Sequence, residues 1–272
     1  RFRRFLGESP MAYLTRWRLQ LGAKALTSTT ASVAQGAIGA CLPGGSLRYY
    51  RGTLSAITTP FLQLHVTSLS LVLGLVCIRP PGHHAERVTA MGFCFFNNAA
   101  ISARYAQKKF GIGRVAIIDW DVHHGNGTQD IFWNDASVMY CSTHEMPLYP
   151  GTGARDECGD HDTIVNAPLS AGDGGDMFRD AFTHVILPRL SAFAPELVII
   201  SAGFDAHWRD PLANINLEER DFSWATQRLL DLAEKHASGR VISLLEGGYD
   251  LEGLSRSVAA HVSTLMGHGI AV

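Results

Sequence analysis

The segment at residues 119–127, which reads Asp-Trp-Asp-Val-His-His-Gly-Asn-Gly, carries side chains that could bind a metal ion. It directly follows the apolar run at residues 115–118, which is typical of a buried strand in a parallel sheet. Ligands of open α/β sheets bind at the carboxyl ends of strands, where Asp121 and His123 would project into one crevice. An Asp-x-His pair alone is a weak signal, because two polar residues after a strand more often form a turn or a cap.

Three further polar clusters strengthen the metal hypothesis, because each follows an apolar run of strand length. They are residues 80–84 after residues 75–78, residues 201–207 after residues 197–200, and residues 246–249 after residues 241–245. The second cluster supplies Asp205, which by itself would read as a helix cap. Together with Asp121 and His123 it completes the three-ligand set, with one open position, that is typical of a catalytic zinc site.

The four clusters together resemble the zinc-dependent histone deacetylase and acetylpolyamine amidohydrolase family, and its class II and bacterial members in particular. The resemblance runs from about residue 78 to about residue 266, and it includes further matching stretches at residues 91–98, 142–153 and 210–213. It implies an arginase-like α/β fold in which helices flank a parallel sheet. It also implies hydrolysis of an acylated amine by metal-activated water.

Amide hydrolysis needs a base to take a proton and an acid to deliver it to the departing amine, besides the metal. The resemblance assigns both the base and the acid role to His84, paired with Asn126, and an electrostatic and orienting role to His83, paired with Asp119. Tyr249 would donate a hydrogen bond to the oxyanion, a contribution on the order of 3 kcal/mol. The alternatives are a surface histidine pair and a tyrosine packed in a loop.

The resemblance also implies a substrate tunnel and a second cation site. Gly92, Phe93 and Tyr149 resemble the walls of an acyl-lysine tunnel, and Leu212 would line its mouth. Polyamine-selective relatives tend to carry an acidic residue near Leu212, so this leucine favours acyl-lysine or another acylated amine. A monovalent cation, K⁺ for example, would be held by backbone and carboxylate oxygens, which suit such a hard ion. The matching residues are Asp119, Asp121, His123, Ser142 and Thr143.

Composition is consistent with an enzyme domain and gives no reason to expect bulk attraction to nucleic acid or membrane. The 272 residues are 46% hydrophobic, and the formal net charge is −2. Five cysteines without Cys-x-x-Cys spacing indicate neither a disulfide framework nor a thiolate zinc site. The apolar run at residues 69–78 is too short to cross a membrane, and the first residues do not resemble a signal peptide. We therefore expect a cytoplasmic protein.

From residue 78 onward, apolar runs alternate with longer helical patterns, as expected for a parallel sheet flanked by helices. Predicted strands cover residues 115–118, 138–141, 197–200 and 241–245, and predicted helices cover residues 97–109, 176–193, 218–236 and 254–266. Pro188 should kink or end the second of these helices.

The N-terminal part has a different character. Residues 1–40 resemble a fragment of the DNA-binding domain of an AraC-type regulator, but neither helix-turn-helix is whole, so specific DNA binding is not expected. Residues 41–77 form an unassigned junction, and the catalytic domain would occupy residues 78–272 with its N-terminal part missing or replaced. The alternatives to an active deacetylase are a catalytically impaired remnant and, less favoured, a DNA-binding regulator. The acyl group, the physiological substrate and a homo-oligomeric state stay open.

Overall fold

A computed structural model describes residues 73–267 of the chain, and residues 73–76 and 80–267 belong to one compact unit. This unit contains a six-stranded sheet in which every pairing is parallel. The strands are β1 (Leu73–Val76), β2 (Val115–Asp119), β3 (Val138–Ser142), β4 (Ile164–Asn166), β5 (Leu197–Ala202) and β6 (Val241–Leu245). The α/β fold with a parallel sheet, predicted from the sequence, is confirmed.

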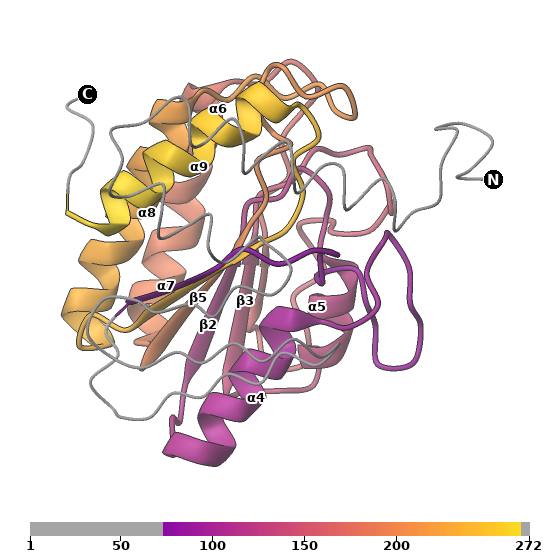
Figure 1. Ribbon diagram of the computed structural model, residues 1–272. Helices are drawn as coiled ribbons and strands as arrows, with labels where there is room; N and C mark the ends of the chain where they lie inside the picture. Colours follow the sequence, from indigo (N-terminus) through magenta and orange to yellow (C-terminus); the bar gives the residue numbers. More distant parts are fainter. Residues whose placement is uncertain (1–72, 268–272) are drawn as a thin grey trace, which may run out of the picture. The chain divides into compact units, whose positions relative to one another are not determined.

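The helices cover both faces of this sheet. They are α4 (Asn98–Phe110), α5 (Asn126–Phe132), α6 (Gly175–Ala181), the π-helical turn η1 (Phe182–Ile186), α7 (Leu187–Phe193), α8 (Glu219–His236) and α9 (Leu251–Leu265). Helices α6 to α9 gather on one side, and α4 and α5 lie on the other (Figure 1). The central strands β2, β3, β5 and β6 are buried at every position, as continuous apolar runs with covered faces should be.

The order of the strands creates a switch point in the middle of the sheet. The order is β1-β6-β5-β2-β3-β4, so the chain leaves β2 in one direction and returns to its other side with β5. Asp119, the last residue of β2, lies opposite Ser201 of β5 and Ser142 of β3. Crevices of open α/β sheets form at such points, outside the carboxyl ends of the strands.

Local signals explain where the helices begin and end. Asn97 caps α4 by accepting a hydrogen bond from the Ala100 N–H, and α4 ends at Gly111 with φ +68°. Helix α8 begins with a reciprocal capping box between Glu218 and Asp221. The helix predicted for residues 176–193 is interrupted by the π turn η1 directly before α7. Pro188 lies in the first turn of α7 and has no N–H to donate, which accounts for the interruption.

Three features of the fold differ from the sequence prediction. The first strand covers residues 73–76 rather than the apolar run at residues 75–78. Helix α5 and strand β4 carry no clear signal, because α5 contains Gly127 and Thr128 near its start and β4 has three residues. Residues 1–72, with the regulator-like fragment and most of the junction, lie outside the described residues. Within the described range, no helix is long and apolar enough to span a membrane.

Candidate active site and metal centre

The reactive side chains gather at the carboxyl ends of β2, β5 and β6, three neighbouring strands at the centre of the sheet. Asp121 and His123 lie in the loop after β2, Asp205 lies three residues after β5, and Glu246 directly follows β6. The switch point between β2 and β5 therefore falls in the middle of the cluster. Strand order, rather than spacing in the sequence, is what brings these residues together.

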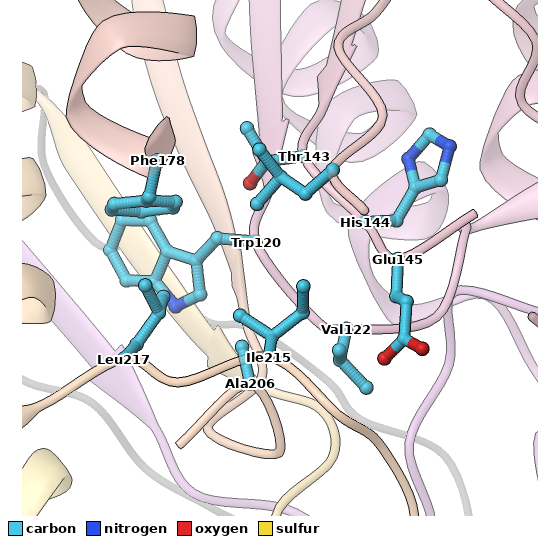
Figure 2. Close-up of a pocket in the computed structure, with 10 residues that line it drawn as sticks. Trp120, Val122, Thr143, His144, Glu145, Phe178, Ala206, Ile215 and Leu217 are labelled. Atoms are coloured by element: carbon cyan, nitrogen blue, oxygen red, sulfur yellow. The ribbon is translucent and has the colours of Figure 1, made fainter. Parts of the chain in front are cut away.

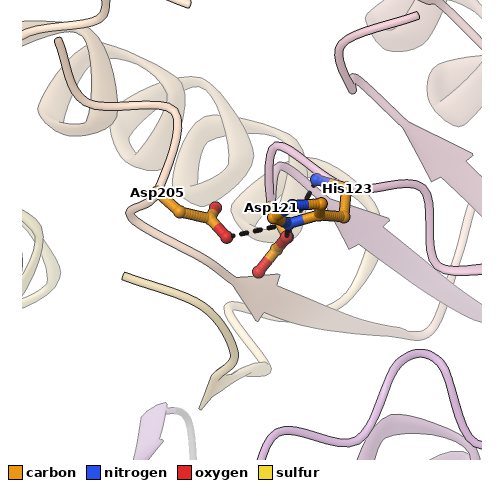
Figure 3. Close-up of side chains that lie close together, drawn as sticks. All are labelled: Asp121, His123 and Asp205. Atoms are coloured by element: carbon orange, nitrogen blue, oxygen red, sulfur yellow. Dashed lines mark hydrogen bonds and ion pairs between the residues drawn. The ribbon is translucent and has the colours of Figure 1, made fainter. Parts of the chain in front are cut away.

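Asp121, His123 and Asp205 form a compact set of metal-ligand side chains, turned toward one another in Figure 3. One potential ligand atom from each lies within 4.8 Å of the others. His123 Nδ1 is 3.2 Å from Asp121 Oδ1 and 3.1 Å from Asp205 Oδ2. The two carboxylates are 1% and 0% exposed, whereas the imidazole is 13% exposed. One imidazole and two carboxylates, with an accessible side at the histidine, fit a divalent ion that keeps an open position.

The charges of this set also favour a cation. Burial, together with the nearby Asp121 carboxylate, raises the pKa of Asp205 to about 7. Burial by itself would lower the pKa of His123, but hydrogen bonds to Asp121 and Asp205 and the charge of both carboxylates raise it to about 11. Two buried carboxylates thus share one positive charge, which a divalent ion would replace.

Backbone groups hold the two carboxylates in place. The Gly247 N–H donates to Asp121 Oδ2 at 2.6 Å, and the Val122 N–H donates to Asp205 Oδ1 at 2.8 Å. A Cβ at Gly247 would lie 2.1 Å from Asp205 Oδ2, and one at Gly203 would lie 2.3 Å from Asp121 Oδ2. Only glycine leaves room at these two positions for the backbone to approach the carboxylates.

The adjacent histidines differ in charge because their partners differ. His83 Nδ1 lies 3.0 Å from Asp119 Oδ2, and Asp119 also accepts the Tyr140 hydroxyl at 3.1 Å. Burial by itself would lower the pKa of His83, but the Asp121 and Asp119 carboxylates raise it to about 10. His84 is 4% exposed, and its burial and the charge of His83 lower its pKa to about 3. The structure therefore holds one charged imidazole beside one neutral imidazole.

The tautomer of His84 follows from its contacts. Its Nδ1 lies 2.8 Å from Asn126 Oδ1, while Asn126 Nδ2 donates to Glu86 Oε1 at 2.8 Å. The amide oxygen therefore accepts from Nδ1–H, and Nε2 of His84 keeps its lone pair. The His84 and His123 ring centroids are 6.1 Å apart. A neutral base thus lies next to the metal-ligand set, and both histidine pairings expected from the sequence are present.

Two of the four predicted tunnel residues, Tyr149 and Gly92, pack against His84. The Tyr149 ring lies 5.1 Å from the His84 ring and is 47% exposed. Gly92 has φ +54°, and a Cβ there would lie 2.2 Å from His84 Cδ2, so the backbone packs directly on the imidazole. Phe93 has φ +65° and is 61% exposed, and Leu212 is 47% exposed. A positive φ at a phenylalanine is strained backbone, which is often found at ligand-binding sites.

A histone deacetylase domain model matches residues 21–265 of the chain. The chain belongs to the histone deacetylase family. Histone deacetylase 10, chloroplastic, of Oryza sativa is 45% identical over 72% of this chain and 45% of its own length. A probable deacetylase of Archaeoglobus fulgidus is 46% identical over 65% of this chain and 50% of its own length. The crystal structure of the HDA15 HD domain superposes with a TM-score of 0.68 at 47% identity, covering 73% of this chain and 57% of that one.

This family match bears on the N-terminal part of the chain. It begins at residue 21, ahead of residue 78, where the recognised motifs begin. The AraC-like character of residues 1–40 finds no support in these comparisons. The chain spans about half the length of the deacetylases from Oryza sativa and Archaeoglobus fulgidus. The replacement of the N-terminal part of the domain stays a prediction.

Tyr249 and the residues of the predicted monovalent-cation site lie around this deacetylase centre. Tyr249 is half-buried and follows Gly247 and Gly248, which places it two residues from the backbone donor to Asp121. On the other side of β2, the Thr143 N–H donates to the Asp119 carbonyl at 3.0 Å. Ser142 Oγ lies 2.9 Å from His144 Nδ1, and Thr143 Oγ1 is buried without a hydrogen-bond partner. Of these groups, the Asp119 carbonyl and Ser142 Oγ already have hydrogen-bond partners, and the predicted monovalent-cation site stays a prediction.

A separate narrow hollow, with no room for a ligand, is lined mainly by apolar side chains, among them Trp120, Phe178 and Leu217 (Figure 2). It contains no predicted zinc ligand and none of the predicted catalytic side chains. Trp120 lies between Asp119 and Asp121 in the chain. Because successive side chains at a strand end point to opposite faces, its indole points away from the side on which the two aspartates lie. The hollow is therefore packing space and not the substrate tunnel.

Two further residues, for which the sequence predicts no role, contribute to this site. Glu246 is fully buried, and its Oε2 accepts the Gly82 N–H at 2.6 Å and the His83 N–H at 3.2 Å. Ser201 donates to its Oε1 at 3.1 Å. Tyr140 donates to Asp119 from within β3. The signal for Glu246 is its place directly after a five-residue apolar strand, whereas Tyr140 has none, because tyrosine is common in buried strands.

Proposed function

We propose that this chain is a zinc-dependent amidohydrolase that removes an acyl group from acyl-lysine or a related acylated amine. The proposal rests on the convergence of Asp121, His123 and Asp205 beside the neutral His84, within a histone deacetylase domain. Zinc held by these three residues would polarise the amide carbonyl and acidify a water molecule. The donor set supports zinc because two carboxylates and one imidazole leave the ion an open coordination position.

Side chains of the site carry out the proton transfers and stabilise the charge that develops during the reaction. His84 Nε2 takes the proton of the attacking water and later delivers it to the amine nitrogen as the carbon–nitrogen bond breaks. Asn126 keeps this nitrogen free by accepting from Nδ1–H. His83 stays charged between Asp119 and Asp121 and stabilises the negative charge of the tetrahedral intermediate. Tyr249 donates its hydroxyl hydrogen to the oxyanion.

The mouth of the site favours acyl-lysine over an acylated polyamine. A second cation on a polyamine would be attracted by a carboxylate at the mouth, and Leu212 offers none at its position. Phe93 and Tyr149 are exposed aromatic side chains near His84 that suit the aliphatic stem of a lysine. For the predicted second ion, we propose that oxygens of Asp119, Asp121, His123, Ser142 and Thr143 bind K⁺.

Purified protein tests the proposal with an acetyl-lysine peptide as substrate. We expect turnover that a zinc chelator abolishes and that added zinc restores. Tyr249→Phe should keep the metal and lower turnover by roughly a hundredfold, as loss of one oxyanion donor does. Tyr105→Phe, in α4, is the matched control and should retain full activity. Turnover that is insensitive to chelation, or equal in both variants, would contradict the mechanism.

A further inference from the structure

Asp210 joins two parts of the candidate site that come from distant positions in the chain. Its Oδ2 accepts the N–H of Tyr249 at 2.7 Å and that of Asp250 at 3.3 Å. Its Oδ1 accepts the Leu212 N–H at 3.0 Å. Asp210 is 6% exposed, so these three donors replace the water that the carboxylate would otherwise bind.

The neighbouring residue reinforces this connection. Arg209 Nε lies 3.0 Å from Asp250 Oδ1, and its Nη2 lies 3.1 Å from Glu252 Oε2. Asp250 is also the N-cap of α9, where its side chain accepts the Gly253 N–H at 2.7 Å. The backbone that carries Tyr249 is therefore held at the start of α9 by two adjacent side chains from the loop that follows Asp205.

The tyrosine needs such support because of its surroundings in the chain. It follows Gly247 and Gly248, and Gly248 has φ +127°, a region that other residues rarely adopt. Glycine pairs allow many backbone conformations, so they do not by themselves define the direction of the next side chain. A hydroxyl that stabilises an oxyanion must be placed before the reaction, because reorientation during the reaction reduces its effect.

We propose that Asp210 is a positioning residue that orients Tyr249 and links it to the Leu212 loop at the mouth of the site. The inference rests on the proposed function, since it concerns the same reaction. A carboxylate suits the task because both of its oxygens only accept, and they face three N–H groups. In Asp210→Asn the amide oxygen can still accept the Tyr249 and Asp250 N–H groups, and only the contact to Leu212 is lost. Asp210→Ala removes all three contacts and is therefore the variant that tests the tether.

The first test measures the backbone tether and does not depend on activity. Hydrogen exchange of a peptide covering residues 246–253 should become at least about tenfold faster in Asp210→Ala, because a charge-assisted hydrogen bond corresponds to about that factor or more. Asp221→Ala is the matched control, since Asp221 is also buried and accepts a backbone N–H at the start of α8. It should leave exchange at residues 246–253 unchanged. Exchange that is unchanged in Asp210→Ala would overturn the inference.

The second test is a double-mutant cycle with Tyr249→Phe, with zinc content measured in every variant. Alone, Asp210→Ala should lower kcat roughly 10- to 100-fold with zinc retained, since a displacement of about 1 Å at a reacting group has effects of that size. In the Tyr249→Phe background, the same substitution should lower kcat less than about twofold, because the hydroxyl it orients is already absent.

The outcomes of the two tests separate the inference from the proposed function. A full additional loss of kcat in the Tyr249→Phe background would show that Asp210 acts independently of the tyrosine and would overturn the inference. Faster exchange in Asp210→Ala together with no turnover by the wild type would contradict the proposed function and support the tether. Unchanged exchange in Asp210→Ala together with zinc-dependent turnover by the wild type would support the proposed function and overturn the tether.

Discussion

Replacing Gly247 with alanine tests whether the close packing of backbone around the two carboxylates is required for metal binding. The added Cβ would lie 2.1 Å from Asp205 Oδ2 and 2.4 Å from Asp121 Oδ2. Real Cβ atoms essentially never come nearer than 3.0 Å to another heavy atom. The carboxylate oxygens or the backbone must therefore move by at least 0.9 Å (3.0 − 2.1) and 0.6 Å (3.0 − 2.4), respectively.

These displacements are large compared with the roughly 0.2 Å tolerance of a metal–ligand distance. Changes in the groups that hold metal ligands lower metal affinity by about 10- to 100-fold. For Gly247→Ala we expect an effect of that size, which corresponds to about 1.4–2.7 kcal/mol of binding free energy. Backbone strain adds nothing, because the φ angle of Gly247 is not in the left-handed region. The variant should therefore fold and bind zinc weakly.

The measurement is a zinc titration of the metal-free protein in competition with a chelator of known affinity. Gly174→Ala is the matched control, because the nearest atom to a Cβ there is Asn216 O at 3.6 Å, an ordinary contact. The control should bind zinc as the wild type does. Zinc affinity in Gly247→Ala equal to that of the control would refute the reasoning, since it would show that the carboxylates do not need their present positions.

Further substitutions test the ligands, the base and the buried Glu246. Elemental analysis should find much less than one zinc per chain in Asp205→Ala, whereas the exposed-site control Asp156→Ala should keep its zinc. Equal zinc content in both variants would contradict the assignment of Asp205 as a ligand. His84→Ala should keep zinc but lose at least as much turnover as a variant without the oxyanion donor, with exposed His161→Ala as control. Burial raises the pKa of Glu246 to about 7 from its ordinary 4.5, so its carboxyl contributes fully to stability below about pH 4.5, and the contribution is lost as the pH rises through about 7. Metal-free Glu246→Gln should therefore match the wild type in free energy of unfolding near pH 4.5 and exceed it by up to about 3 kcal/mol at pH 8, as measured by denaturant unfolding; a difference that does not grow with pH would contradict this.

Much of the secondary structure could be predicted from local sequence signals. The strands β2, β3, β5 and β6 are continuous apolar runs ended by polar residues, and the predicted boundaries agree with the structure to within two residues. Helices α4, α8 and α9 have an amphipathic pattern, and polar residues cap their first turns. These features depend on residues only a few positions apart, so they can be predicted without knowledge of the tertiary structure. Helix α5 and strand β4 are held mainly by contacts with distant elements and lack such signals.

The sequence also predicts the candidate metal site and the family. Asp121, His123 and Asp205 each follow an apolar run, and the structure brings them together as a set that could hold a metal ion. The ordered motifs indicate the histone deacetylase family, and the family match confirms it. The sequence does not show how near these side chains lie, since His123 and Asp205 are separated by 82 positions.

Only the tertiary structure decided the strand order and the groups that hold the site residues. The order β1-β6-β5-β2-β3-β4 puts the ends of β2, β5 and β6 side by side, and no single segment encodes this order. The Gly247 N–H reaches Asp121 across 126 positions of sequence, and Glu246 reaches the Gly82 N–H across 164. Such contacts form because buried polar groups must find partners wherever packing places them. That placement results from the burial of the whole sheet between its helices, which a local stretch of sequence cannot specify.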